Sequence, residues 1–222
     1  MFPVQSTPKT LTTKAVVFDL DQTLVATQED YYPVTVVTDN PQGYLLESRL
    51  YQLETKSSNP FKAGWKFWGV TRPYTREFLE FAFTYFRVVG VWSAGTADYV
   101  AEIVKYLFPP GTRQPHVIFT RDDIVANGET DVGKPLAKLY SHNEVFERYM
   151  NEKNTMIIDD NPSTSLYNKA NIVNIPRYEP ACGVTPMLSA DFALQKLQRW
   201  LLLPEVMSAP DVQLLDKTRI FT

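Results

Sequence analysis

Short apolar runs alternate with longer amphipathic segments along most of the chain. The short runs are rich in β-branched residues and bounded by polar ones, as buried strands are. They cover residues 14–20, 87–92, 116–120, 155–159 and 171–175. The longer segments have helical spacing and cover residues 72–86, 96–108, 134–150 (one or two helices) and 189–203. This alternation predicts an α/β fold: a Rossmann-like, doubly wound parallel sheet with helices on both faces. Pro204 is expected to end the last helix.

Residues 26–69, which follow the first strand, have a different pattern. Two extended runs flank an Asn-Pro-Gln-Gly stretch at residues 40–43, where Pro in the second position and Gly in the fourth fit a type I turn. We therefore expect a small insertion rich in β-hairpin structure. Trp65, Phe67 and Trp68 come after the hairpin, and we expect them to pack beneath the insertion rather than to contact a ligand.

Composition sets limits on the domain organisation. The chain has 222 residues, 44% of them hydrophobic, and a formal net charge of −3. A chain of this size can bury a core without cross-links, so we expect one domain over residues 1–222, with the insertion at about 26–69 and a tail at about 205–222. The chain has no basic surplus, so we expect no direct binding of nucleic acid.

Features that direct a protein to a compartment are few. Cys182 is the only cysteine, so no intrachain disulfide can form, which suits a reducing compartment. The N-terminus lacks the apolar core of a signal peptide, and no apolar run approaches the roughly 20 residues of a membrane-spanning helix. We expect a soluble intracellular protein of the nucleus or cytoplasm, with no membrane partner. The oligomeric state stays open.

Polar side chains follow three of the predicted strands. Asp19 and Asp21 follow the first, Ser93 the second, and Asp159 and Asp160 the fourth. In a doubly wound sheet the ligand site lies beyond the carboxyl ends of the strands. Carboxylates this close repel each other unless a cation lies between them, and oxygen ligands suit Mg²⁺. The pattern therefore indicates a magnesium site at this edge of the sheet.

These residues could carry out phosphoryl transfer. One aspartate would attack phosphorus and form an aspartyl-phosphate, and the second would protonate the leaving oxygen and then activate water. Lys134 and Ser93 would hold the transferring phosphoryl group. Each residue alone has an ordinary explanation, because an Asp at a strand end is commonly a turn former or helix cap. Their order along the chain favours the functional interpretation.

The same order resembles the haloacid dehalogenase superfamily and, within it, the NLI-interacting-factor-like phosphatases that act on the C-terminal repeat domain of RNA polymerase II. The motifs that carry the resemblance are DLDQTLV at 19–25, RP at 72–73, WSA at 92–94, KPL at 134–136 and DDNP at 159–162. Together they span residues 14 to about 205.

The resemblance implies a role for each acidic residue. Asp19 would be the nucleophile and a metal ligand. Asp21 would be the general acid and base, and its main-chain carbonyl would also bind the metal. Asp160 would complete the protein ligands of Mg²⁺, with Asp159 and Asn161 in support.

The resemblance also implies the groups that hold the substrate. Ser93, Ala94 and Lys134 would bind the phosphoryl group, and Ser93 and Lys134 would take part in catalysis. Thr23 would join this set and orient the loop of the nucleophile. The chain departs from the family at Gly95, where Ser is usual, and at Pro135, where Asp is usual. These departures leave the chemistry in place and the substrate open.

The function implied is a Mg²⁺-dependent phosphatase that hydrolyses phosphoserine or phosphothreonine in proteins, with the RNA polymerase II C-terminal repeat among the candidate substrates. Two alternatives stay open. One is a phosphatase of the same superfamily acting on a small molecule or a nucleic-acid end. The other is a phosphoprotein-binding scaffold with little catalysis.

Overall fold

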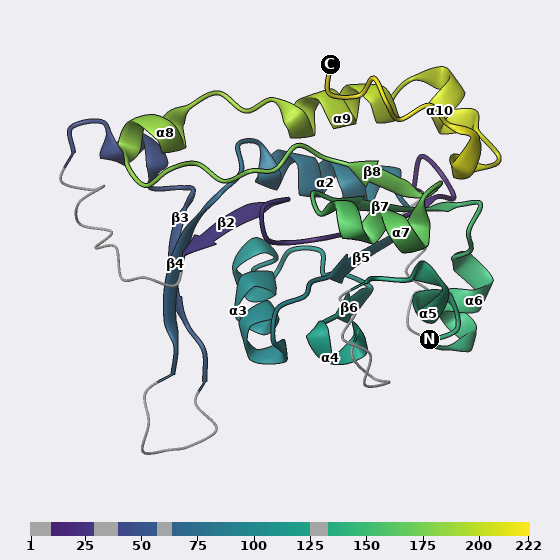
Figure 1. The fold of residues 1–222 in the computed structure, drawn as a ribbon, viewed down its shortest axis with the longest axis horizontal. Helices are drawn as coiled ribbons and strands as arrows, with labels where there is room; N and C mark the ends of the chain where they lie inside the picture. The colour runs from purple at the N-terminus through teal and green to yellow at the C-terminus, as the bar shows by residue number, and fades with distance from the viewer. Residues whose placement is uncertain (1–9, 29–39, 57–63, 125–132) are drawn as a thin grey trace, which may run out of the picture.

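A five-stranded parallel sheet forms the centre of the computed structural model, which describes residues 10–28, 40–56, 64–124 and 133–222 (Figure 1). The strand order is β6-β5-β1-β7-β8. The strands are β1 (Ala15–Phe18), β5 (Val88–Trp92), β6 (Val117–Phe119), β7 (Thr155–Asp159) and β8 (Ile172–Asn174). β1 is central because it pairs in parallel with both β5 and β7.

The helices cover both faces of this sheet, except for Val184–Leu188, which packs against the insertion. They are α2 (Thr75–Tyr85), α3 (Ala97–Leu107), α4 (Arg121–Ile124), α5 (Leu136–Tyr140), α6 (Glu144–Tyr149), α7 (Ser165–Asn168), α8 (Val184–Leu188), α9 (Ala193–Leu201) and α10 (Pro204–Ser208). Short 3-10 helices occupy Gly43–Leu46 (η1), Pro162–Thr164 (η2) and Val212–Leu214 (η3). The predicted helix at 134–150 is therefore two helices, and Pro204 begins α10 rather than only ending α9.

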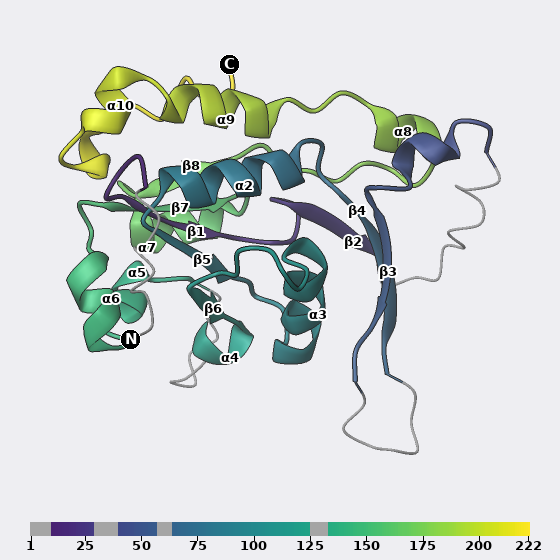
Figure 2. The ribbon, with the colours of Figure 1, turned by 180° about the vertical axis from the view of Figure 1, so that it is seen from behind.

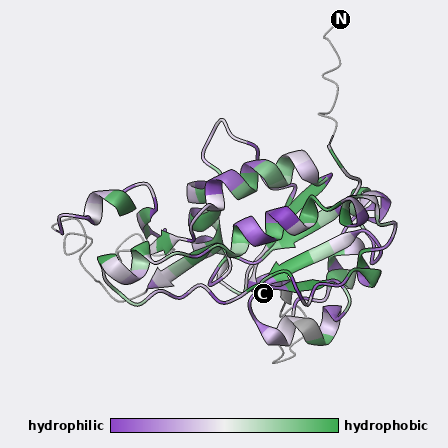
Figure 3. Cartoon of the chain, turned by 90° about the horizontal axis from the view of Figure 1, so that it is seen from above, coloured by the Kyte–Doolittle hydropathy of each residue, from purple (hydrophilic) through white to green (hydrophobic). Residues whose placement is uncertain are grey.

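The core has two halves because alternate residues of β1 point to opposite faces. Val16 and Phe18 pack in the cluster that includes α2, α3 and α9, whereas Ala15 and Val17 pack in the cluster that includes α5. Figure 3 shows the strands as mainly hydrophobic beneath helices of mixed character. This arrangement confirms the predicted doubly wound α/β fold.

A second, antiparallel sheet stands beside the first and has the strand order β2-β4-β3 (Figure 2). Its strands are β2 (Val25–Gln28), β3 (Leu50–Glu54) and β4 (Lys66–Thr71). It occupies the region predicted as the insertion and confirms its β character. The division into a core, an insertion and a tail stays a prediction.

The prediction of a β-hairpin around residues 40–43 is wrong for its second strand. The turn itself forms, since the Gly43 N–H donates to the carbonyl of Asn40 at 2.8 Å. The chain then continues as η1, because Leu46 is buried in a cluster with α8. β3 pairs with β4 instead. The run before the turn falls largely on residues 29–39, which lie outside the described residues.

The three aromatic residues near β4 differ in their exposure to solvent. Phe67 and Trp68 are buried, as predicted, whereas the prediction fails for Trp65, which is 77% exposed. Trp65 lies just before β4, where its main chain pairs with Thr55 across the hairpin. Its ring is therefore a solvent-facing apolar surface on an anchored main chain.

One buried arginine joins four segments next to the β1–β2 loop. Arg72 is fully buried, and its guanidinium donates two 2.9 Å hydrogen bonds to the carboxylate of Asp191. The same group donates to the carbonyls of Thr23 at 3.1 Å and Pro176 at 2.7 Å. The planar fork of arginine suits such a junction because its donors are fixed relative to one another.

Asp191→Ala is expected to lower the free energy of unfolding by about 3 kcal/mol, because it leaves the buried Arg72 charge unpaired. Urea unfolding followed by circular dichroism measures the change. Glu179→Ala is the matched control: it breaks the exposed Arg177–Glu179 ion pair, which should be worth under about 1 kcal/mol. Equal losses in the two variants would show that Arg72 is not the junction described.

Candidate active site

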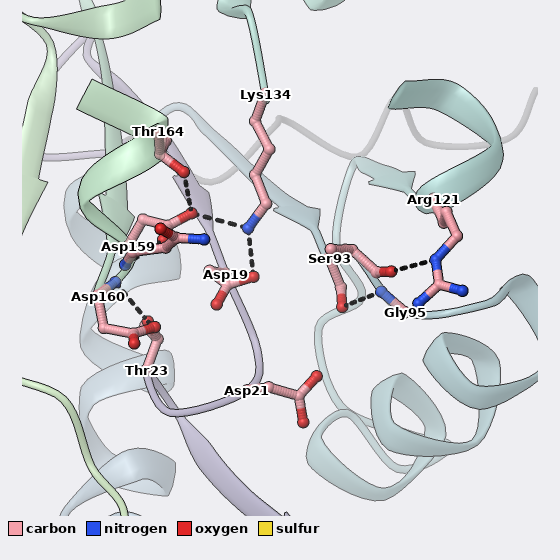
Figure 4. Close-up of polar contacts among 12 residues, drawn as sticks. Asp19, Asp21, Thr23, Ser93, Gly95, Arg121, Lys134, Asp159, Asp160 and Thr164 are labelled. Atoms are coloured by element: carbon pink, nitrogen blue, oxygen red, sulfur yellow. Dashed lines mark hydrogen bonds and ion pairs between the residues drawn. The ribbon is translucent and has the colours of Figure 1, made fainter. Parts of the chain in front are cut away.

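The predicted polar residues gather at the carboxyl ends of the parallel strands. Asp19 follows β1, Ser93 follows β5, Asp159 ends β7 and Asp160 comes next. All of them appear in one close-up (Figure 4). The site lies at this edge because parallel strands bring their carboxyl ends together.

The ammonium of Lys134 lies between two buried carboxylates. It donates to Oδ1 of Asp19 and, at 2.7 Å, to Oδ2 of Asp159. Asn168 holds the lysine segment, since its amide donates to the Lys134 carbonyl at 2.7 Å and accepts from the Leu136 N–H at 3.0 Å. The structure thus joins Lys134 directly to the aspartates, and its predicted role of holding the phosphoryl group stays a prediction.

The acidic residues after β7 are held in different ways. Asp159 also accepts from the Asn161 N–H at 2.8 Å and the Thr164 hydroxyl at 3.1 Å. Asp160 accepts a 3.2 Å hydrogen bond from the hydroxyl of Thr23. Thr23 is fully buried, so it contacts Asp160 rather than lining the groove.

The carboxylates fit a divalent cation. Asp19, Asp159 and Asp160 each offer an oxygen, and these atoms lie within 4.8 Å of one another. Hard oxygen ligands around excess negative charge suit Mg²⁺. Asp159 is fully buried and already bonded to Lys134, so Asp160 is the more available ligand from this segment.

The side chain of Asp21 takes no part in this acidic cluster. Its carboxylate points away from Asp19, toward α3 (Figure 4), and accepts from the hydroxyls of Tyr99 and, at 3.0 Å, Thr27. The side chains of the two motif aspartates therefore point in different directions. Metal binding by the Asp21 carbonyl stays a prediction.

A tight turn follows the two aspartates. Gln22 has a φ of 58°, and its N–H donates to the Val25 carbonyl at 2.7 Å. The N–H groups of Leu24 and Val25 both donate to the Leu20 carbonyl. The chain thus turns back tightly after Asp21 and enters β2.

Burial and crowding dominate the electrostatics. Burial raises the pKa of Asp19 to about 8, although the ammonium of Lys134 lowers it. Burial also raises the pKa of Asp21 and of Asp160. For Lys134, burial acts to lower the pKa, but the charges of Asp19 and Asp159 raise it overall. Lys134 therefore stays positively charged, and a further cation would stabilise the ionised form of the carboxylates around it.

The turn after β5 forms the opposite wall. The Ser93 hydroxyl accepts from the Gly95 N–H at 3.0 Å, and the carbonyl of Ala94 accepts from the Arg121 side chain at 2.8 Å. Asn161, Ser93 and Ala94 line the same groove as Asp19 and Lys134. This arrangement offers a hydroxyl and cationic groups to an anion.

The groove has a volume of about 1060 Å³ and reaches beyond the acidic residues to the β3–β4 hairpin. Trp65 and Phe67 line its far end, and Arg121 and Arg177 also line it. A ligand longer than the reacting group would therefore meet an aromatic surface and positive charge.

Arg121 and Thr27 are site residues that sequence reasoning missed. Arg121 had a usable signal, since it comes shortly after the predicted strand at 116–120, where polar residues were sought. Thr27 had none, because its contact depends on pairing within the insertion.

Comparison with known proteins gives a family. Residues 14–202 match the model of the NLI interacting factor-like phosphatases. No match is found among curated proteins. Within the described part of the chain, no helix is both long and apolar enough to cross a bilayer.

Two solved structures are similar in fold. One is the fission yeast RNA polymerase II CTD phosphatase Fcp1 bound to beryllium fluoride, with 20% identity and a TM-score of 0.59 over 84% of this chain and 49% of that one. The other is Fcp1, an essential RNA polymerase II CTD phosphatase, with 21% identity and a TM-score of 0.59 over 92% and 58%. The chain thus spans about half the length of these structures. The likeness confirms the predicted haloacid dehalogenase fold.

Without metal, the free energy of unfolding is expected to fall as the pH rises from about 5 to about 8. In this window folded Asp19, with its pKa raised to about 8, keeps a proton that the unfolded chain has lost. The slope should be on the order of 1 kcal/mol per pH unit. The raised pKa of Lys134 acts only above 10.5 and does not oppose it.

Urea unfolding in EDTA at several pH values measures this slope. Asp19→Asn removes the titrating group and should flatten the dependence. If the free energy of unfolding falls equally with pH in the wild type and in Asp19→Asn, Asp19 is not the group responsible for the pH dependence.

Proposed function

This chain belongs to the NLI interacting factor-like phosphatase family, and we propose that it is a Mg²⁺-dependent phosphatase of phosphoserine and phosphothreonine in proteins. The observation that carries the proposal is the position of Asp19. Its buried carboxylate touches the ammonium of Lys134 and lines a groove that also contains the separate carboxylate of Asp21. A nucleophile and a proton donor thus reach one space from different walls.

In the first step, a carboxylate oxygen of Asp19 forms a bond to phosphorus and the bond from phosphorus to the serine or threonine oxygen breaks. The electron pair goes to the leaving oxygen, and Asp21 gives that oxygen a proton. The product is an aspartyl-phosphate on Asp19 and a free hydroxyl group on the substrate.

In the second step, Asp21 takes a proton from water as the water oxygen attacks phosphorus. The bond between Asp19 and phosphorus breaks, which releases inorganic phosphate and restores both carboxyl groups. Lys134 and Ser93 hold the phosphoryl oxygens through both steps. Arg121 lies next to Ser93 and adds positive charge there.

Asp19, Asp160 and the carbonyl of Asp21 would hold Mg²⁺, with Asp159 and Asn161 in support. When bound, the metal neutralises charge on the transferring group. Thr23 keeps Asp160 in place through its 3.2 Å hydrogen bond.

The groove supports a protein substrate over a small molecule. It extends from the acidic residues to the exposed ring of Trp65, farther than a lone phosphate ester needs. An extended segment around a phosphoserine could follow this path. Because similar structures are RNA polymerase II CTD phosphatases, the phosphorylated repeat of that polymerase is the first peptide to test.

Asp19→Asn is expected to abolish phosphate release, with a loss of at least about 10³-fold, because the amide cannot form the phosphoenzyme. The assay uses an aryl phosphate and a phosphoserine peptide with Mg²⁺, and EDTA should stop the wild type on both. Asp122→Asn, an exposed carboxylate on α4, is the matched control and should retain activity. A folded Asp19→Asn protein with full activity would contradict the mechanism.

Trp65→Ala is expected to raise KM for the phosphopeptide about tenfold and to leave aryl phosphate hydrolysis unchanged, since one aromatic anchor is worth about 1.5 kcal/mol or more. Initial rates across peptide concentrations measure it. Leu214→Ala removes a similarly exposed side chain, 82% exposed, from a segment outside the groove. If both variants bind peptide like the wild type, the peptide does not use this end of the groove.

A further inference from the structure

A row of hydroxyl groups connects the antiparallel sheet with Asp21. The Tyr51 hydroxyl on β3 lies 2.7 Å from the Thr27 hydroxyl on β2. Thr27 donates to Oδ1 of Asp21 at 3.0 Å, and the hydroxyl of Tyr99 on α3 donates to the same oxygen. Asp21 is therefore held from two elements outside its own loop.

The sheet is shaped to let this row form. Thr27 and Tyr51 lie on the two outer strands, and both are in register with Gly69 on the central strand, β4. A Cβ at Gly69 would lie 2.3 Å from the Tyr51 hydroxyl oxygen. Glycine thus leaves the space through which the tyrosine reaches across a whole strand to Thr27.

The Tyr51 side chain is fixed in this position. It is 4% exposed, and its ring packs against that of Tyr106 with a centroid distance of 4.8 Å. Burial raises the pKa of Tyr51, so the hydroxyl keeps its proton and can donate. A donation from Tyr51 leaves the single Thr27 proton free to point at Asp21 or at the Tyr99 hydroxyl, which lies 2.6 Å from Thr27 and itself donates to Asp21. On either route Thr27 supports the same carboxylate oxygen.

We propose that Thr27, oriented by Tyr51, is a positioning residue that aims the Asp21 carboxyl group at the leaving oxygen of the substrate. This inference rests on the proposed function. Both hydroxyl contacts fall on Oδ1, so they fix the rotation of the carboxyl group and leave Oδ2 to transfer the proton. The insertion sheet thereby takes part in the chemistry as well as in the shape of the groove.

Dependence on the leaving group separates this role from a merely structural one. A serine alkoxide leaves only when it is protonated, whereas a nitrophenolate leaves without a proton. Misplacing Asp21 should therefore slow release from phosphoserine and spare release from the aryl ester. The ratio kcat/KM reports steps up to the first irreversible one, which here is departure of the leaving group.

The experiment compares Thr27→Val, Thr27→Ser and Tyr51→Phe with the wild type on nitrophenyl phosphate and on a phosphoserine peptide. For Thr27→Val we expect kcat/KM on the peptide to fall about 30-fold, a part of the 10²–10⁴-fold that general acids supply. Tyr51→Phe should cost about fivefold by the same reasoning. Both should stay within about twofold on the aryl ester, and Thr27→Ser should restore the peptide rate.

Tyr85→Phe is the matched control, because it removes another buried tyrosine hydroxyl, bonded at 2.7 Å to the Leu201 carbonyl and remote from the groove. It should leave kcat/KM unchanged on both substrates. Equal losses on both substrates in Thr27→Val, or no loss on the peptide, would overturn the positioning role while leaving the phosphatase in place. A wild type inactive on both substrates would instead remove the proposed function, and the positioning role with it. If Thr27→Val does not fold, Tyr51→Phe decides by the same ratio.

Discussion

The ion pairs of Lys134 are the interaction on which the site depends. Asp19 and Asp159 come from neighbouring strands of a sheet whose centre is apolar, and both are buried. Two such carboxylates repel each other when ionised, and a cation between them offsets that repulsion. The Lys134 ammonium contacts both. Lys134 comes from a loop that is hydrogen-bonded to Asn168. The carboxyl edge of the sheet, this loop and the two ion pairs therefore support one another as one unit.

Around this unit, separate parts of the fold hold the two motif aspartates. The parallel sheet and Lys134 hold Asp19, whereas α3 and the antiparallel sheet hold Asp21. A tight turn with left-handed Gln22 follows Asp21 and leads the chain into β2, which carries Thr27. Arg72 holds the same turn by donating a hydrogen bond to the Thr23 carbonyl. The short motif therefore acts as a junction between two sheets.

Features set by where a strand ends could be predicted from the sequence, whereas contacts that depend on how strands pair could not. The parallel strands, the positions of Asp19, Ser93 and Asp160, and the family all follow from local patterns in the chain. The order of the motifs placed Lys134 at the site, but its direct contact with Asp19 was not predicted.

Pairing within the insertion was not predictable in the same way. Thr27 and Tyr51 meet across Gly69 because of a three-strand register, and no local pattern encodes a register. The exposure of Trp65 was missed for a related reason, since the end of β4 depends on its partner strand. The turn at 40–43 shows the converse, a correct local signal followed by a tertiary contact of Leu46 that redirects the chain.

The central place of β1 also has a consequence for biosynthesis. Ala15 is translated before both of its partners, Val88 on one side and Thr155 on the other. Until β7 has been made, this fully buried strand lacks a neighbour and presents an open edge to other chains. Contacts this distant in sequence form slowly. The growing chain therefore exposes this apolar edge until β7 is made, and Asp19 and Lys134 gain the Asp159 contact only after that point.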